Sequence, residues 1–299
     1  MTSGPASATT GHEEVAAAKL DLFYRDLAAA HLHPLWAVAR ELLPSHPHPQ
    51  AVPWVWRASE TLPLAERAIK AVPVDRGGER RVLSLANPGL HGKPYAAGTL
   101  WAALQCLGPG ETAPAHRHTP GAIRFVLTGT GVWTTVNGIR CDMSPGDLVL
   151  TPAWFWHDHT NGSDGNMVWF DGLDLPLIES LDAVFYEPYP DYTQPTVDRP
   201  PPDAATVAAG YTDCMPRQLG PVPSPLLTYR WADTDTALAS LVAVGDQAMV
   251  TVEFINPETG TSALPTLSCA MCRLVPARRT QPLRRAGNAV FVAFRGAGH

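Results

Sequence analysis

GETAPAHRHTPGAIRFVLTG, residues 110–129, and GDLVLTPAWFWHDHTN, residues 146–161, are the two stretches that decide the fold. In both, short apolar or alternating runs are separated by glycine, proline and asparagine, which is typical of antiparallel strands joined by tight turns. The same pattern extends over residues 80–175, so we expect an all-β sandwich or barrel there. From about residue 13 to residue 43 the apolar residues follow helical spacing, so a helical segment precedes the strands.

Three histidines in these stretches form a candidate metal site. His116 and His118 are two residues apart, so both side chains project from one face of a strand. His157 comes from a different strand. Three neutral imidazoles leave the opposite positions of a metal open for substrate and oxygen, as in non-haem iron(II) oxygenases. His159 also faces inward on a regular strand, and we expect it to hydrogen-bond around the metal site rather than to bind the metal.

The spacing of both stretches resembles the two sequence motifs of the cupin family. The first motif, G-x5-H-x-H-x3-E-x6-G, is matched by Gly110, His116, His118 and Gly129. The second motif, G-x5-P-x-G-x2-H-x3-N, is matched by Gly146, Pro152, His157 and Asn161. Two positions depart from the motifs, because Ala122 stands at the glutamate position and Trp154 at the central glycine position. The missing carboxylate disfavours cupins of the manganese oxalate-oxidase type.

Within the cupins, the chain resembles the bicupin gentisate, salicylate and 1-hydroxy-2-naphthoate 1,2-dioxygenases. The resemblance is carried by RRVLSLANPGL, PAHRHTPGAIRFVLTG, LTPAWFWHDH and WFDGLDLP, and it covers nearly the whole sequence. It implies two double-stranded β-helix (jelly-roll) barrels, Fe(2+) as cofactor, a small aromatic hydroxy acid and O2 as substrates, and a homo-oligomer, commonly a tetramer.

The reaction implied by the resemblance is an extradiol-type cleavage of gentisate (2,5-dihydroxybenzoate) to maleylpyruvate. Salicylate and 1-hydroxy-2-naphthoate are the alternative substrates, because all three chelate a metal in the same way. A cupin binding or sensor protein without catalysis is the alternative from another class.

The resemblance also implies substrate contacts. Arg124 matches an arginine that holds the substrate carboxylate, and its position six residues after His118 places it on the face of the metal ligands. Pairing of Arg124 with Asp171 or another acid is the alternative. Further pocket positions are Arg80, Arg81, Trp101 and Gln105, with either adjacent arginine facing the pocket. Arg124, His159 and Asp171 are the catalytic candidates, the last two for moving or stabilising a proton.

An ungapped repeat predicts a second barrel. Residues 99–131 align with residues 266–298, with about nine of 33 positions identical, including Pro109/Pro276 and Gly129/Gly296. Leu283 and Arg285 stand where the first copy has His116 and His118, so the second barrel is expected to lack metal. The second copy is shorter than the first, so we expect an incomplete barrel or an edge that a partner covers.

These observations divide the chain into five expected parts. They are a disordered N-terminus (1–12), a helical segment (13–79), a metal-binding barrel (80–175), a linker (176–225) and the second barrel (226–299). The net charge of −6 disfavours nucleic-acid binding. We expect no membrane association and a cytoplasmic location, since neither a signal peptide nor a long apolar run is visible. Cys269 and Cys272 form a CxxC pair within a predicted strand, and we expect core cysteines rather than a zinc site.

Overall fold

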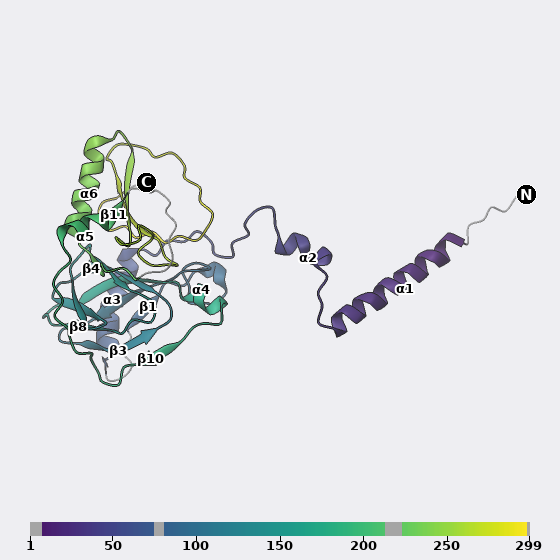
Figure 1. Cartoon of the computed structure of the whole chain (residues 1–299), viewed down its shortest axis with the longest axis horizontal. Helices are drawn as coiled ribbons and strands as arrows, with labels where there is room; N and C mark the ends of the chain where they lie inside the picture. The colour runs from purple at the N-terminus through teal and green to yellow at the C-terminus, as the bar shows by residue number, and fades with distance from the viewer. Residues whose placement is uncertain (1–7, 75–80, 213–222, 298–299) are drawn as a thin grey trace, which may run out of the picture. The chain divides into compact units, whose positions relative to one another are not determined.

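The computed structural model describes residues 8–74, 81–212 and 223–297, and the chain divides into two units, Met1–His48 and Pro49–His299. The first unit contains α1 (Ala8–Ala29) and α2 (Leu35–Leu42), labelled in Figure 1. The expected helix therefore breaks in two. The break falls where His31 adopts a left-handed φ of 54° and Pro34 precedes α2. Residues 8–12, expected to be disordered, belong to α1.

Two antiparallel sheets form the metal-binding part of the second unit. The six-stranded sheet has the order β1 (Val82–Ser84), β2 (Trp101–Leu107), β9 (Met167–Leu173), β4 (Ala122–Thr128), β7 (Leu148–Thr151), β12 (Thr228–Tyr229). The five-stranded sheet has the order β10 (Tyr186–Pro188), β3 (Thr112–His118), β8 (His157–Asn161), β5 (Val132–Val136), β6 (Ile139–Met143). The predominantly β fold expected from the sequence is confirmed.

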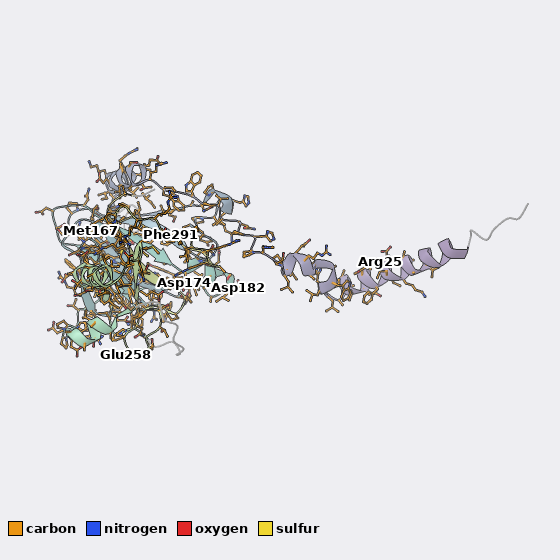
Figure 2. All side chains as sticks on the ribbon, turned by 90° about the horizontal axis from the view of Figure 1, so that it is seen from above. Arg25, Met167, Asp174, Asp182, Glu258 and Phe291 are labelled. Atoms are coloured by element: carbon orange, nitrogen blue, oxygen red, sulfur yellow. The ribbon has the colours of Figure 1, made fainter. Side chains whose placement is uncertain are left out.

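The inner faces of the two sheets enclose a core. Its buried members include Leu107, Val126, Val132, Met167 and Trp169. Met167, labelled in Figure 2, is fully buried among the side chains of this unit. On the outer face, α3 (Ala58–Ala71) covers β2 and β9, because Ala65 packs against Leu104, Cys106 and Val168. A short 3-10 helix, η3 (Pro88–Leu90), lies between β1 and β2.

Residues 176–225, expected as a linker, contribute elements of their own where the structure describes them. They include most of α4 (Leu175–Ser180), then β10, α5 (Ala204–Ala209) and β11 (Tyr211–Thr212). β10 pairs with β3, and Tyr186 lies opposite His118. A strand of three residues that ends in a proline is too short to show alternation in the sequence, which is why the pattern there indicated only a connection.

The second barrel is only partly present among the described residues. β11, β13 (Met249–Phe254) and β14 (Cys269–Leu274) form a three-stranded sheet, and α6 (Trp231–Val244) packs on it through Leu238. β14 coincides with the repeat's counterpart of β2. The expected counterparts of β3 and β4 are not strands in the described residues up to 297. Phe294 instead packs on Phe125 and Trp231, with ring centroids 5.2 and 5.1 Å apart.

The CxxC pair has its two cysteines on opposite faces of β14, as expected for residues three apart. Cys269 is half-buried, whereas Cys272 is exposed, so the expectation of two core cysteines is wrong for Cys272. The reason is that β13 and β14 form a sheet with one face exposed, and Cys272 lies on that face. Cys214 lies outside the described residues.

Asn161, the last residue of the second motif, ties the end of β8 to two neighbouring loops. Its fully buried amide nitrogen donates to the carbonyl oxygens of Gly108 and Gly165 at 2.8 and 2.7 Å. Its amide oxygen accepts from the backbone nitrogen and hydroxyl of Ser163. These bonds satisfy backbone groups that the sheets do not pair, so the motif asparagine has a structural role.

Replacing Asn161 by alanine should lower the free energy of unfolding by about 3 kcal/mol, because several buried hydrogen bonds are lost at once. Asn166→Ala is the matched control, since Asn166 is exposed and only five residues away. Chemical denaturation measures both variants. Equal stability of the two variants would contradict the role assigned to Asn161.

Candidate metal centre

Three imidazoles converge between the two sheets. His116 and His118 lie on β3, and His157 lies on β8 directly opposite His116 in the strand register. One ligand nitrogen from each ring lies within 4.8 Å of the others. The ring centroid of His157 is 4.3 Å from that of His116 and 4.8 Å from that of His118. The structure therefore brings together the three histidines that the sequence singled out.

Each of these rings is oriented by its own backbone. The Nδ1 atoms of His116, His118 and His157 lie 2.8, 2.7 and 2.9 Å from the carbonyl oxygens of Pro114, Pro120 and Phe155. A carbonyl oxygen only accepts, so in all three rings Nδ1 carries a hydrogen and donates it; in the neutral form of such a ring Nε2 has none. The lone pair is then on Nε2, which is the arrangement that metal-binding histidines use.

The three histidines fit a divalent metal ion. The Nε2 atom of His157 is buried and has no hydrogen-bond partner, a costly state for a polar atom that a bound metal would relieve. Burial, and then His116 and His118, hold the pKa of His157 well below its usual value, so the ring is neutral. Ala122, at the motif's glutamate position, is fully buried and offers no ligand. Within the described residues, this trio is the one group with metal-ligand geometry.

A buried ion pair lies on the facing sheet. In the strand register Asp171 stands between Ala103 and Arg124. The Nε atom of Arg124 is 3.5 Å from Oδ1 of Asp171, and both residues are only 3% exposed. Arg124 also donates to the Thr151 hydroxyl, and Trp169 Nε1 donates to Asp171 Oδ1 at 3.0 Å. Pairing with Asp171, the alternative considered for Arg124, is therefore present.

The electrostatics of this pair are dominated by burial. Burial raises the pKa of Asp171 to about 6, although Arg124 and Trp169 both act to lower it. Burial likewise lowers the pKa of Arg124, and Asp171 only partly opposes this. Both shifts have the same cause, since each charge has lost more hydration than its partner restores. Arg124 is thus a desolvated cation that a second anion would stabilise.

His159 lies beside the metal ligands and is not one of the three grouped histidines. It is buried, its Nδ1 is 2.8 Å from the Thr134 hydroxyl, and its ring centroid is 5.8 Å from that of His157. Burial, and then Arg124, hold the pKa of His159 well below its usual value. The sequence reasoning missed Thr134 and Trp169. Strand alternation could have identified Trp169, because it is two residues before Asp171 and therefore lies on the same face of the strand.

The four expected pocket residues divide into different groups. Gln105 is 7% exposed and opposes Trp169, so it belongs to the inner face with Asp171. Trp101 is the first residue of the same strand, β2, and lies on the same face as Gln105. Its Nε1 donates to the Ser84 hydroxyl at 3.1 Å. Arg80 lies outside the described residues.

Arg81 is not part of this group, which corrects the sequence expectation. Val82 opposes Gln105 on the inner face, so the preceding Arg81 faces the other side, opposite Cys106. There its side chain is buried and forms an ion pair with Glu111. Adjacent residues on a strand point to opposite faces, and the register assigns Arg81 to the face that α3 covers.

Comparison with known proteins agrees with this geometry. Residues 103–173 match the family model described as the cupin domain. Among the described residues, no helix is both long and apolar enough to cross a bilayer. A solved structure, salicylate 1,2-dioxygenase from Pseudaminobacter salicylatoxidans, superposes with a TM-score of 0.71 at 40% identity, covering 86% of this chain and 75% of that chain.

Relatives in sequence extend over almost the whole chain. Gentisate 1,2-dioxygenase from Streptomyces sp is 44% identical over 296 residues, which are 96% of this chain and 82% of the relative. The 1-hydroxy-2-naphthoate 1,2-dioxygenase from Nocardioides sp. (strain KP7) is 35% identical over 98% of this chain and 76% of the relative. With these identities and coverages, the chain belongs to the cupin family of gentisate, salicylate and 1-hydroxy-2-naphthoate 1,2-dioxygenases.

Proposed function

We propose that this protein is an iron(II)-dependent gentisate 1,2-dioxygenase. The observation that carries the proposal is the trio of inward-facing Nε2 atoms on His116, His118 and His157, which faces the desolvated Arg124 within one core. Arg124 lies near enough to influence the pKa values of both His157 and His159. A substrate with a carboxylate beside a hydroxyl matches a site that combines a metal with a buried cation.

The proposed cofactor follows from the donor set and the chemistry. Imidazole nitrogen suits iron, and three protein ligands on one side leave positions for substrate and O2. When bound, iron(II) supplies the redox chemistry by which O2 and the aromatic ring react. The chain's own task is to hold the ring in one orientation and to keep water away, so the buried strands β4, β8 and β9 do most of the positioning.

Arg124 is proposed to bind the substrate carboxylate while Asp171 fixes its orientation. The Asp171 carboxylate already accepts from Trp169 and lies beside Arg124 Nε, and Nη1 donates to Thr151, so the anion would bind the remaining N–H groups of the guanidinium. Asp171 and His159 are proposed to hold or move the proton of a substrate hydroxyl. Gln105 and Trp101 line the wall contributed by β2. The cytoplasmic location and the homo-oligomer remain predictions.

Salicylate and 1-hydroxy-2-naphthoate are the second candidate substrates. Two observations favour them: the structural likeness to a salicylate 1,2-dioxygenase and the sequence likeness to a 1-hydroxy-2-naphthoate 1,2-dioxygenase. Gentisate is preferred because gentisate dioxygenases include relatives at 44% and 40% identity. The electron-donating second hydroxyl of gentisate also eases attack on the ring.

The function predicts oxygen uptake by the Fe(II)-loaded protein with gentisate, at least tenfold faster than with salicylate or 1-hydroxy-2-naphthoate. His116→Ala, His118→Ala and His157→Ala should each lose both uptake and bound iron, because a three-ligand site does not survive the loss of one ligand. An oxygen electrode and metal analysis measure the two effects. His33→Ala, at an exposed histidine, is the control.

The parent protein should bind one iron per chain, and Leu283→Ala and Arg285→Ala should leave that number unchanged. Two irons per chain, or a histidine variant that keeps full iron and turnover, would overturn the ligand assignment. Faster oxygen uptake with salicylate than with gentisate would show that salicylate is the preferred substrate.

Arg124→Ala should keep its iron and lower kcat/KM for gentisate roughly ten- to a hundredfold, since a charge-assisted hydrogen bond in a dry site contributes about 1.5–3 kcal/mol. Arg124→Lys should recover little, because a point charge does not reproduce the planar guanidinium. Steady-state kinetics on iron-normalised protein measure this. A variant that loses iron but keeps the wild-type KM for gentisate would assign Arg124 to the metal shell instead.

The pH dependence of kcat/KM should show a limb governed by Asp171. Its pKa is raised to about 6, so the carboxyl is neutral below that pH and no longer orients the facing Arg124. Activity per bound iron should therefore fall as the pH drops through about 6 and level off above it. Asp171→Asn should remove this limb and lower the plateau. Iron content at each pH is the control for metal loss, and an unchanged limb in the variant would exclude Asp171 as its source.

A further inference from the structure

Arg117 stands between the two ligands of β3 and faces the side opposite to them. Its guanidinium lies over the rings of both Trp154 and Trp156, with the carbon 4.2 Å from each ring centroid. Its Nε and Nη2 atoms both donate to Oε2 of Glu187, at 2.9 and 2.6 Å. One side chain therefore connects its own strand, β3, to two other segments of the chain.

Each of these segments carries part of the site. β3 carries His116 and His118, and the Trp154–Trp156 turn leads directly into His157. Glu187 lies at the centre of β10, where it opposes Arg117 in the register. The neighbouring Tyr186 falls on the inner face, and its ring stacks on the ring of His116, with centroids 5.3 Å apart and planes 30° apart. Arg117 thus joins both ligand-bearing segments to the strand that covers one of the ligands.

Trp154 contributes to this connection although its backbone conformation is energetically unfavourable. It occupies the glycine position of the second motif and adopts a φ of 65°, the left-handed region that side chains disfavour. Its backbone nitrogen donates to the His118 carbonyl oxygen at 2.9 Å, and its ring stacks on Phe185 with centroids 4.9 Å apart. A glycine would avoid the strain, but it would lose the contacts with both Arg117 and Phe185.

We propose that Arg117 is a positioning residue for the metal centre. Through Trp154, Trp156 and Glu187 it holds the turn before His157 and the strand bearing Tyr186 in place against the ligands on β3. The Arg117–Glu187 ion pair is partly exposed, at 25% and 41%, and such pairs alone contribute little. The effect therefore comes from one planar cation serving all three segments. The inference rests on the proposed function, since it concerns the same metal site.

The test compares Arg117→Met and Arg117→Lys with a matched control. Arg140 has the same chemistry on the far edge of the same sheet, with its guanidinium carbon 3.9 Å from the Trp133 ring centroid and its Nε 2.8 Å from Asp142. Arg140→Met therefore removes an equivalent cation–ring contact and ion pair away from the site. The probe is Co²⁺, followed by its visible absorption bands and by its rate of transfer to a chelator.

Arg117→Met should release Co²⁺ roughly tenfold faster than wild type, shift the Co²⁺ bands, and raise KM for gentisate more than it lowers kcat. Arg117→Lys should rescue little of this, and Arg140→Met should behave like wild type. Trp154→Gly should also release Co²⁺ faster, although relief of the left-handed backbone keeps its melting temperature close to that of wild type.

Several outcomes would overturn the proposal. An Arg117→Met variant that is less stable but has wild-type Co²⁺ bands and a wild-type release rate would make Arg117 structural only. Equal effects of Arg117→Met and Arg140→Met would show that the position beside the ligands does not matter. Failure of the wild-type protein to bind Co²⁺ or Fe²⁺, or to consume O2 with gentisate, would instead overturn the proposed function on which this inference rests.

Discussion

The pairing of β3 with β8 is the constraint on which the centre depends. It sets His157 opposite His116, while the two-residue period of β3 brings His118 to the same face. Pairing alone would leave the rings free to rotate. The bonds from each Nδ1 to a carbonyl oxygen two residues away remove that freedom, so Nε2 of each ring faces inward. Strand geometry and local backbone acceptors together preorganise the ligands before any metal arrives.

The facing sheet supplies the opposite electrostatic character. Burial destabilises the charged forms of Arg124 and Asp171 more than their mutual attraction stabilises them. The pKa of Arg124 is therefore lowered and that of Asp171 raised. Such a pair is a poor way to stabilise a fold. It is a suitable way to hold a cation ready for a substrate anion, because that anion completes the neutralisation that Asp171 begins. The energetic weakness of the pair and its proposed function therefore have one cause.

β10 links the metal-binding sheet to the chain that follows it. It places Tyr186 over His116 and Glu187 over Arg117, one residue on each face of the same edge. A departure from the usual motif, Trp154 in place of glycine, is compensated by ring contacts with Phe185, just before this strand, and with Arg117. The left-handed backbone at Trp154 and the cation over its ring are therefore parts of one arrangement.

The sequence by itself determined the features that depend on local spacing. The strand-rich centre and the shared face of His116 and His118 follow from short-range periodicity and turn residues, which act within a few residues. The positions of His157 and Asn161 and the absence of a carboxylate at Ala122 follow from the spacing of the two cupin motifs. Only the tertiary structure decided the features that depend on register between distant strands. It gave Arg124 the Asp171 carboxylate as neighbour and turned Arg81 to the outer face. It also left the repeat's later strands unformed among the described residues, where Phe294 packs on Trp231 of α6 and Phe125 of β4. Register places residues that are tens of positions apart side by side, and a single sequence carries no local signal of that choice.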